Sequence, residues 1–382
     1  MSKANEFPLR ALLAGARRKE PQLLMLTRKL VETESPSEAK SAVDACIALA
    51  AEHARQLGGR VKLHRQRGYG NQLEARFGPK RPVGRTLLLG HLDTVWPLGT
   101  LATMPCRAKD GRLWGPGTLD MKAGAAMAFT AVELLTEAQL LEREIVLLLT
   151  GDEEIGSPSS RPLVEELARE CEAVFVLEPA QGLAYKTARK GVGDWKISVE
   201  GIAAHAGVDF TKGASALREL ARAIETVSGW TDLKRGLTVS VGVAGGGSKS
   251  NVIPAEAWAE VDVRIARKAD AARIARRFAG LKPNDRRCKI TATGGINRPP
   301  MERSRGTVKL FRKAQALAGE LGFALDEAAS GGGSDGNFTA ALGIATLDGM
   351  GAVGEGAHAR HESVLIEHLA PRTALLAAML AG

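Results

Sequence analysis

The strongest constraint on the fold is an alternation of short apolar runs with stretches of helical pattern in the first half of the chain. Helical patterns occur at Ala123–Thr136 and Arg161–Arg169, and the apolar runs are Thr86–Gly90, Ile145–Thr150 and Ala173–Leu177. Short apolar strands separated by helices form a mainly parallel sheet with helices packed on its faces. A further helix is expected from Ser35 to Gly59, with the Ser-Pro-Ser-Glu motif as its start. The sequence therefore predicts an α/β layer.

The pattern changes near Lys190, where strands of alternating polarity replace the apolar runs. Ala257–Ile265 alternates apolar with polar side chains, which predicts one buried and one exposed face. Further strands are expected at Gly193–Glu200 and Leu237–Val243, and a helix at Ser215–Val227. The chain has 382 residues, enough for two domains, so these patterns predict a second, small antiparallel α+β domain.

The end of the chain is expected to return to the first layer. Helical patterns occur at Val308–Gly319 and from Ile366 onward. The glycine-rich segments Gly242–Gly247 and Gly331–Gly333 are expected to be loops.

The positive charge of the chain is concentrated in one segment. The formal net charge is +9, and Arg264–Arg287 alone holds nine Lys or Arg against two Asp or Glu. We interpret this segment as the solvated face of an amphipathic helix whose apolar side carries Ile274 and Phe278. An anion-attracting patch near an acidic substrate is the alternative. A nucleic-acid-binding protein is disfavoured, because only 4% of the residues are aromatic and no base-stacking motif interrupts the charges.

Other features favour a cytoplasmic protein without a membrane partner. The longest apolar stretch, Leu375–Ala381, is too short to cross a bilayer, and Met1–Arg10 lacks the apolar region of a secretion signal. The cysteines are far apart and form no C-x-x-C pair, so we expect them to be reduced packing residues. They are Cys46, Cys106, Cys171 and Cys288.

Ionisable residues follow the ends of the predicted strands. His91 and Asp93 follow the first strand, and their spacing suits an imidazole backed by a carboxylate. The run Asp152-Glu153-Glu154 follows the next strand, and three adjacent carboxylates repel one another unless a cation relieves them. Taken alone, either pattern could be structural. Together with the carboxylates of Asp120 and Glu178 and the imidazole of His358 or His361, these residues suit zinc and allow two ions to share one carboxylate.

The order of these motifs resembles the co-catalytic zinc aminoacylase/carboxypeptidase family, which includes glutamate carboxypeptidase, acetylornithine deacetylase and succinyl-diaminopimelate desuccinylase. The resemblance covers six motifs between His91 and Glu362, and Gly115-Pro116-Gly117 and His205-Ala206-Gly207 are most similar to the glutamate carboxypeptidase branch. It implies a zinc-peptidase catalytic domain with a mainly parallel sheet, formed by residues 1–188 and 300–382. It also implies an inserted α+β lid and dimerisation domain at residues 189–299.

The resemblance also implies a set of three ligands for each of two metal ions. One zinc ion would be held by His91, Asp120 and Glu178. A second would be held by Asp120, Glu154 and His358, so that Asp120 bridges the two ions. Cobalt or manganese could replace zinc. His361 is a less favoured alternative to His358, which precedes Glu362 by four residues as in the family.

Two carboxylates would act beside the metals. Asp93 would orient His91, and Glu153 would be the general base that takes a proton from water. Ala123 stands where the family usually has glycine, and the added methyl group is expected to leave the metals unaffected.

The remaining implied residues act on the substrate. His205 would reach the active site of a neighbouring subunit and stabilise the oxyanion. Asn251 and Arg264 would hold the substrate, and the backbone of Gly332 and Gly333 would bind its carboxylate.

The function implied is that of a homodimeric dizinc hydrolase, joined through its lid. It would cleave an amide bond to release a C-terminal amino acid, with glutamate as the first expectation, from a peptide-like or N-acyl substrate. The alternative is an N-acyl-amino-acid deacylase of the acetylornithine deacetylase or desuccinylase type. A metal-free binding or scaffold relative is disfavoured, because all five ligand positions hold side chains that can bind metal.

Overall fold

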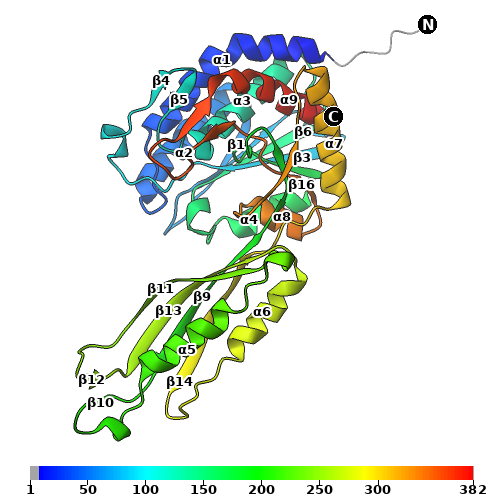
Figure 1. Ribbon diagram of the computed structural model, residues 1–382. Coiled ribbons are helices and arrows are strands. Elements are labelled where there is room, and N and C mark those ends of the chain that lie inside the picture. The colour runs from blue at the N-terminus through cyan, green and yellow to red at the C-terminus, as the bar shows by residue number, and fades with distance from the viewer. Residues whose placement is uncertain (1–7, 382) are drawn as a thin grey trace. The chain divides into compact units, whose positions relative to one another are not determined.

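The computed structural model describes residues 8–381, which form two compact units (Figure 1). Unit 1 contains the described residues up to Ala188, together with Arg303–Ser330 and those from Ser334 onward. Unit 2 contains Arg189–Glu302 and Gly331–Gly333. The catalytic and lid roles expected for these ranges stay predictions. Residues 1–7, which form most of the segment used to argue against secretion, lie outside the described residues.

The central sheet of unit 1 confirms the predicted mainly parallel α/β architecture. Strand β3 lies between β6 and β7, and these three strands and β16 run parallel to one another, whereas β2 is antiparallel to β6 and β1 is antiparallel to β2. The order across the sheet is β1 (Arg60–His64), β2 (Gln72–Phe77), β6 (Glu144–Thr150), β3 (Arg85–His91), β7 (Ala173–Val176) and β16 (Ala345–Leu347).

Helices cover both faces of this sheet. On one face, helices α1, α3 and α9 pack against one another, and α2 and α7 join the same apolar core. A second core forms on the opposite face under α4 and α8. Burial on both faces explains why Leu87, Leu88 and Leu89 are all apolar. The helices are α1 (Leu9–Glu32), α2 (Lys40–Gln56), α3 (Ala123–Glu137), α4 (Arg161–Arg169), α7 (Arg305–Glu320), α8 (Gly336–Ala341) and α9 (Leu369–Ala381).

Short strands complete unit 1. One small sheet has the order β17 (Gly354–Glu355), β18 (Ser363–Leu365), β5 (Arg112–Trp114) and β4 (Arg107–Lys109). Strand β15 (Glu327–Ser330) pairs with β8 (Tyr185–Arg189). No helix among the described residues is long and apolar enough to cross a membrane. The four cysteines are free, and all but Cys106 are buried.

The predicted start of α2 at Ser35 is wrong, because the residues before Lys40 make other contacts. The hydroxyl of Ser35 donates to the carbonyl of Leu92, and Ser37 donates to the carboxylate of Asp93. Pro36 also forms an isolated bridge with Thr94. These contacts hold the segment in a bridge and a turn beside the end of β3, so the helix begins only at Lys40.

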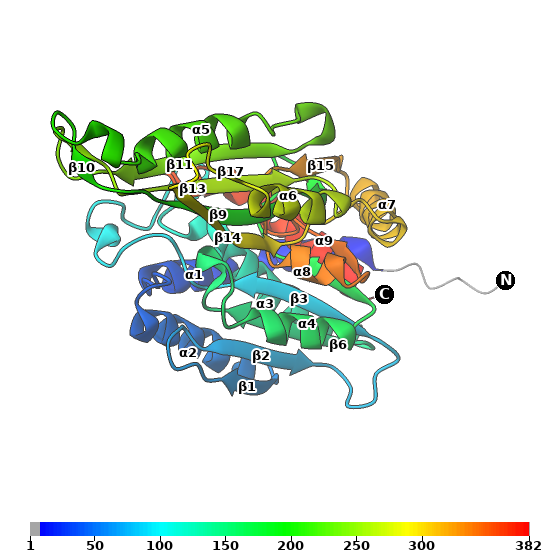
Figure 2. The ribbon, with the colours of Figure 1, turned by 90° about the horizontal axis from the view of Figure 1, so that it is seen from below.

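Unit 2 is an antiparallel sheet with helices packed on one face (Figures 1 and 2). The strand order is β11 (Thr238–Gly246), β13 (Glu256–Ile265), β9 (Gly191–Glu200) and β14 (Lys289–Arg298), and the helices are α5 (Ala216–Ser228) and α6 (Ala269–Ala279). A separate pair joins β10 (Ala204–His205) to β12 (Val252–Ile253). The expected loop at Gly242–Gly247 is wrong, since β11 extends to Gly246. Glycine at position 245 leaves room for the ring of Trp258.

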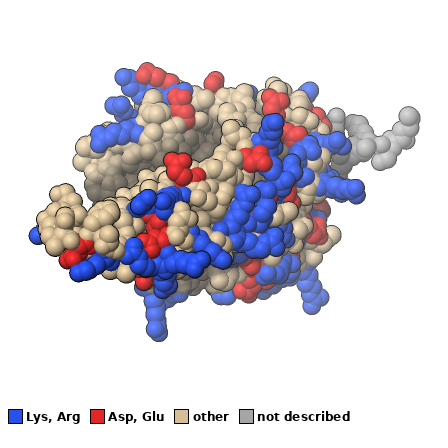
Figure 3. Space-filling model, turned by 60° about the horizontal axis from the view of Figure 1, so that its bottom comes forward, with Lys and Arg blue, Asp and Glu red and all other residues tan. Residues whose placement is uncertain are grey.

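The basic segment forms the predicted amphipathic helix. In α6, Ile274 and Phe278 are buried in the core of unit 2, whereas Arg276 and Arg277 are exposed. Arg273 is partly buried and pairs with Asp270 of the same helix at 3.0 Å. Basic side chains also outnumber acidic ones on the face of the molecule drawn in Figure 3.

Candidate metal centre

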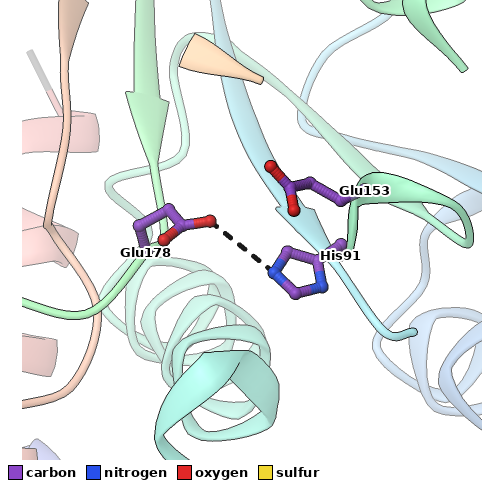
Figure 4. Close-up of side chains that lie close together, drawn as sticks. All are labelled: His91, Glu153 and Glu178. Carbon is purple, nitrogen blue, oxygen red and sulfur yellow. Dashed lines mark ion pairs between the residues drawn. The ribbon is translucent and has the colours of Figure 1, made fainter. Parts of the chain in front are cut away.

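Polar side chains meet at the carboxyl edge of the unit 1 sheet. His91 is the last residue of β3, Glu153 lies three residues after the end of β6, and Glu178 lies two residues after the end of β7. Since these strands are parallel neighbours, their carboxyl ends share one edge. Figure 4 shows the carboxylates of Glu153 and Glu178 reaching toward the imidazole of His91, whose Nε2 is 3.6 Å from Oε1 of Glu178.

Asp120 lies between the two imidazoles of the site. It belongs to an irregular helical turn at Thr118–Lys122, where its own φ of −113° and ψ of 92° depart from helical geometry. Its Oδ1 is 3.2 Å from Nε2 of His91, and its Oδ2 is 3.4 Å from Nε2 of His358. One carboxylate thus presents a different oxygen to each imidazole, which is the arrangement needed for a bridging ligand.

His358 approaches a second carboxylate from the far end of the chain. Its Nε2 is 3.2 Å from both carboxylate oxygens of Glu154. The imidazole of His361 packs beside Gly356 instead. The structure therefore brings the favoured histidine of the pair to the carboxylates.

The donor set fits divalent cations. Ligand atoms of His91, Glu153 and Glu178 lie within 4.8 Å of one another, as do those of His91, Asp120 and Glu154. Imidazole nitrogen and carboxylate oxygen are ligands for zinc, cobalt and manganese, and carboxylates this close repel one another without a cation or proton. The division of the ligands into two sets, with Glu153 outside both, stays a prediction.

The charges of the metal-free site depend on one another. Burial lowers the pKa of His91, but hydrogen bonds with carboxylates, led by Asp120, raise that pKa well above its usual value. Hydrogen bonds with Asp120 and Glu154 raise the pKa of His358 to about 10. Burial acts to raise the pKa of Asp120, yet the two imidazoles hold it well below its usual range. Burial also raises the pKa of Glu154. Protonated imidazoles therefore take the place of cations in the metal-free protein.

Asp93 ties the end of β3 to the turn that carries Glu153 and Glu154. Its buried carboxylate accepts hydrogen bonds from Ser37 Oγ at 2.7 Å, from the backbone N–H of Glu153 at 3.2 Å and from that of Glu154 at 3.1 Å. Nδ1 of His91 is 3.5 Å from Oδ1 of Asp93 and 3.0 Å from its carbonyl oxygen. Asp93 thus contacts both His91 and the adjacent glutamates. The role of Ser37 was not predicted, because the Ser-Pro-Ser pattern indicated a helix start.

Asp152 corrects one expectation. The sequence predicts that three adjacent carboxylates face a cation, but Oδ2 of Asp152 accepts N–H bonds from Ser159 at 2.7 Å and Ser160 at 3.2 Å. Asp152 is fully buried and holds the turn before α4. Of these three carboxylates, only Glu153 and Glu154 belong to the groups of side chains that could hold a metal ion.

The predicted substrate residues all belong to unit 2. His205 is exposed, and its Nδ1 accepts N–H bonds from Gly207 at 3.1 Å and Val208 at 3.2 Å. Asn251 is also exposed, and its carbonyl accepts the N–H of Ala206. The roles of these residues on substrate stay predictions.

Arg264 and the glycine loop already have partners within unit 2. The guanidinium of Arg264 binds Asp262, two residues earlier on the same face of β13, at 2.7 to 3.0 Å. The carbonyls of Gly332 and Gly333 accept hydrogen bonds from Arg189 at 3.4 and 3.0 Å. Recognition of a substrate carboxylate by Arg264 would therefore compete with Asp262.

Comparison with known proteins identifies the family. Residues 87–382 match the family described as Peptidase family M20/M25/M40. The chain belongs to this family. Its M20 identity confirms the resemblance seen in the motifs and makes the protein a hydrolase of the metallopeptidase and amidohydrolase class.

Similar proteins cover nearly the whole M20 chain. It is 29% identical over 380 residues to carboxypeptidase G2 of Pseudomonas sp. (strain RS-16), covering 97% of this chain and 91% of that protein. It is 28% identical over 344 residues to succinyl-diaminopimelate desuccinylase of Stenotrophomonas maltophilia (strain R551-3), covering 85% and 90%. The fold is similar to that of aminopeptidase PepT from Bacillus cereus ATCC 10987, with a TM-score of 0.81, 23% identity and coverage of 95% and 98%.

Metal binding near neutral pH should release protons from this M20 site. The raised pKa values of His91 and His358 keep both imidazoles protonated in the metal-free protein, whereas a metal ligand must be a neutral imidazole. We expect about two protons released per chain, measured by calorimetric titration of zinc in buffers of different ionisation enthalpy. His358→Gln should release about one proton fewer. A binding enthalpy that is independent of the buffer would contradict this account.

Proposed function

We propose that this M20 protein is a dizinc hydrolase that releases a C-terminal amino acid from peptide-like or N-acyl substrates. The amino acid that we propose is glutamate. The observation that carries the proposal is the position of the Asp120 carboxylate. Its Oδ1 lies 3.2 Å from Nε2 of His91, and its Oδ2 lies 3.4 Å from Nε2 of His358. Similarity to carboxypeptidase G2 supports the carboxypeptidase assignment. A desuccinylase of nearly equal identity supports the alternative, an N-acyl-amino-acid deacylase.

We assign proton transfer in this reaction to Glu153. Two bound cations would polarise the scissile carbonyl and lower the pKa of a water molecule. Glu153 then accepts a proton from that water as the new C–O bond forms, and delivers it to the amine nitrogen as the C–N bond breaks. Its carboxylate lies in the cluster with His91 and Glu178, and its backbone N–H is held by Asp93 at 3.2 Å.

The working unit in this proposal is a homodimer joined through unit 2. Strand β11 lies at the edge of its sheet, and Val243 on this strand is 50% exposed. Ile202, Val208 and Phe210, in the segment around His205, are also exposed apolar residues. An apolar edge strand and exposed apolar side chains favour association with a second copy. In such a dimer, His205 would stabilise the oxyanion in the partner's active site.

A substrate screen tests the choice between the two activities. We expect the zinc-loaded enzyme to hydrolyse N-acyl-glutamate and dipeptides ending in glutamate with a higher kcat/KM than N-succinyl-diaminopimelate or N-acetylornithine. Amidation of the terminal carboxylate should abolish this preference. Faster hydrolysis of the succinyl or acetyl substrates would favour the deacylase instead.

Substitution of Glu153 should affect kcat, whereas substitution of Glu154 should affect metal content. Glu153→Gln should lower kcat by about 10²–10⁴-fold while the metal content is retained, because the amide cannot accept the proton. Glu154→Gln is the matched control, since it removes the carboxylate next to His358 and should lower metal content. Measurements of kcat and of bound metal separate the two effects. A Glu153→Gln variant with near-normal kcat would rule out the general base.

Complementation between inactive variants tests the role of His205 in the partner's site. Co-refolding Glu153→Ala with His205→Ala should restore roughly a quarter of wild-type activity, because half of the dimers are mixed and each has one intact site. The control pair, Glu153→Ala with Glu178→Ala, should restore none, since both residues act in their own chain. Proven heterodimers of the first pair without recovered activity would contradict action in trans.

A further inference from the structure

Glu362 is a buried carboxylate that the proposed chemistry does not use. It is fully buried and receives four N–H hydrogen bonds. Oε2 accepts from the indole of Trp96 at 2.8 Å and from the backbone of Gly117 at 2.9 Å. Oε1 accepts from the backbone of Leu119 at 2.8 Å and of Asp120 at 3.0 Å. A carboxylate is costly to bury unless donors such as these satisfy it.

The backbone around Asp120 depends on this carboxylate. Gly117 has a φ of 70°, and Asp120 lies outside helical geometry, so the turn departs from a regular helix. The N–H groups of Gly117, Leu119 and Asp120 instead converge on Glu362. The position of the Asp120 backbone is therefore set by an acceptor from a distant part of the chain.

The same glutamate belongs to the segment that carries His358. Glu362 follows His358 by four residues and immediately precedes β18, which pairs with β5 through Ser363 and Trp114. The N–H of Gly115 also donates to the carbonyl of Glu362 at 3.3 Å. Glu362 thus joins the segment bearing one imidazole to the turn bearing the shared carboxylate.

We propose that Glu362 is a positioning residue for the dinuclear centre, which holds Asp120 where its two oxygens reach both metal positions. The proposal rests on the metal centre of the proposed function. Both charge and length matter for this role. Glu362→Gln replaces one acceptor oxygen with an NH₂ group, which faces N–H donors, and Glu362→Asp shortens the reach of the carboxylate by one methylene.

Metal affinity and the spectrum of the cobalt-loaded protein distinguish positioning from a purely structural role. We expect Glu362→Gln to weaken cobalt binding by about 10–100-fold in chelator competition and to shift the visible absorption bands of the bound cobalt. Glu144→Gln is the matched control. Glu144 is also a buried carboxylate of unit 1, but it begins β6 at the opposite end of the strand and pairs with Arg60, Arg76 and Arg85. This control should lose thermal stability and keep the cobalt affinity and spectrum.

A second readout is independent of metal. The indole N–H resonance of Trp96 in the ¹⁵N spectrum of the metal-free protein should move in Glu362→Gln and stay in place in Glu144→Gln. If Glu362→Gln fails to fold, Glu362→Asp carries the same test, because it retains the charge and should still shift the cobalt bands. Wild-type cobalt affinity and spectrum in a folded Glu362 variant would overturn the proposal. A wild-type protein that binds two cobalt ions without amide hydrolysis would instead count against the proposed function alone.

Discussion

Repulsion between carboxylates gathered at one sheet edge is the constraint on which the rest of the site depends. Asp120, Glu153, Glu154 and Glu178 are held close to His91 or His358 by strands and turns that the apolar core of unit 1 fixes in place. Without metal, the imidazoles offset this charge by keeping their protons, as their raised pKa values indicate. The same groups can exchange those protons for divalent cations. The fold thus brings these carboxylates together, and their negative charge favours a divalent cation as the ligand.

Backbone hydrogen bonds to two buried carboxylates hold the turns that carry candidate metal ligands. Asp93 accepts the N–H groups of Glu153 and Glu154, and Glu362 accepts those of the turn that carries Asp120. Acceptors of this kind fix the direction of a neighbouring side chain without touching the metal. Such hydrogen bonds allow candidate ligands from segments distant in sequence to lie at a defined spacing.

The sequence predicted much of this arrangement, because strands buried on both faces must be apolar and their carboxyl ends must meet. The positions of β3, β6 and β7 and the candidate ligands at their ends follow from that rule. Features that depend on backbone contacts could not be predicted in this way. Asp152 has the same side chain as the candidate ligand Asp120, but it holds a turn. Ser35 was expected to begin a helix, but that helix begins at Lys40. The partners of Glu362 are mostly backbone N–H groups, which cannot be recognised from the residue types in the sequence.

Anomalous diffraction from crystals of the zinc-loaded protein tests the central claim most directly. Data collected at the zinc absorption edge should show two peaks per chain, one on each side of Asp120, with Oδ1 directed to the ion near His91 and Oδ2 to the ion near His358. A single peak at full zinc loading, or two peaks that do not share Asp120, would contradict the account.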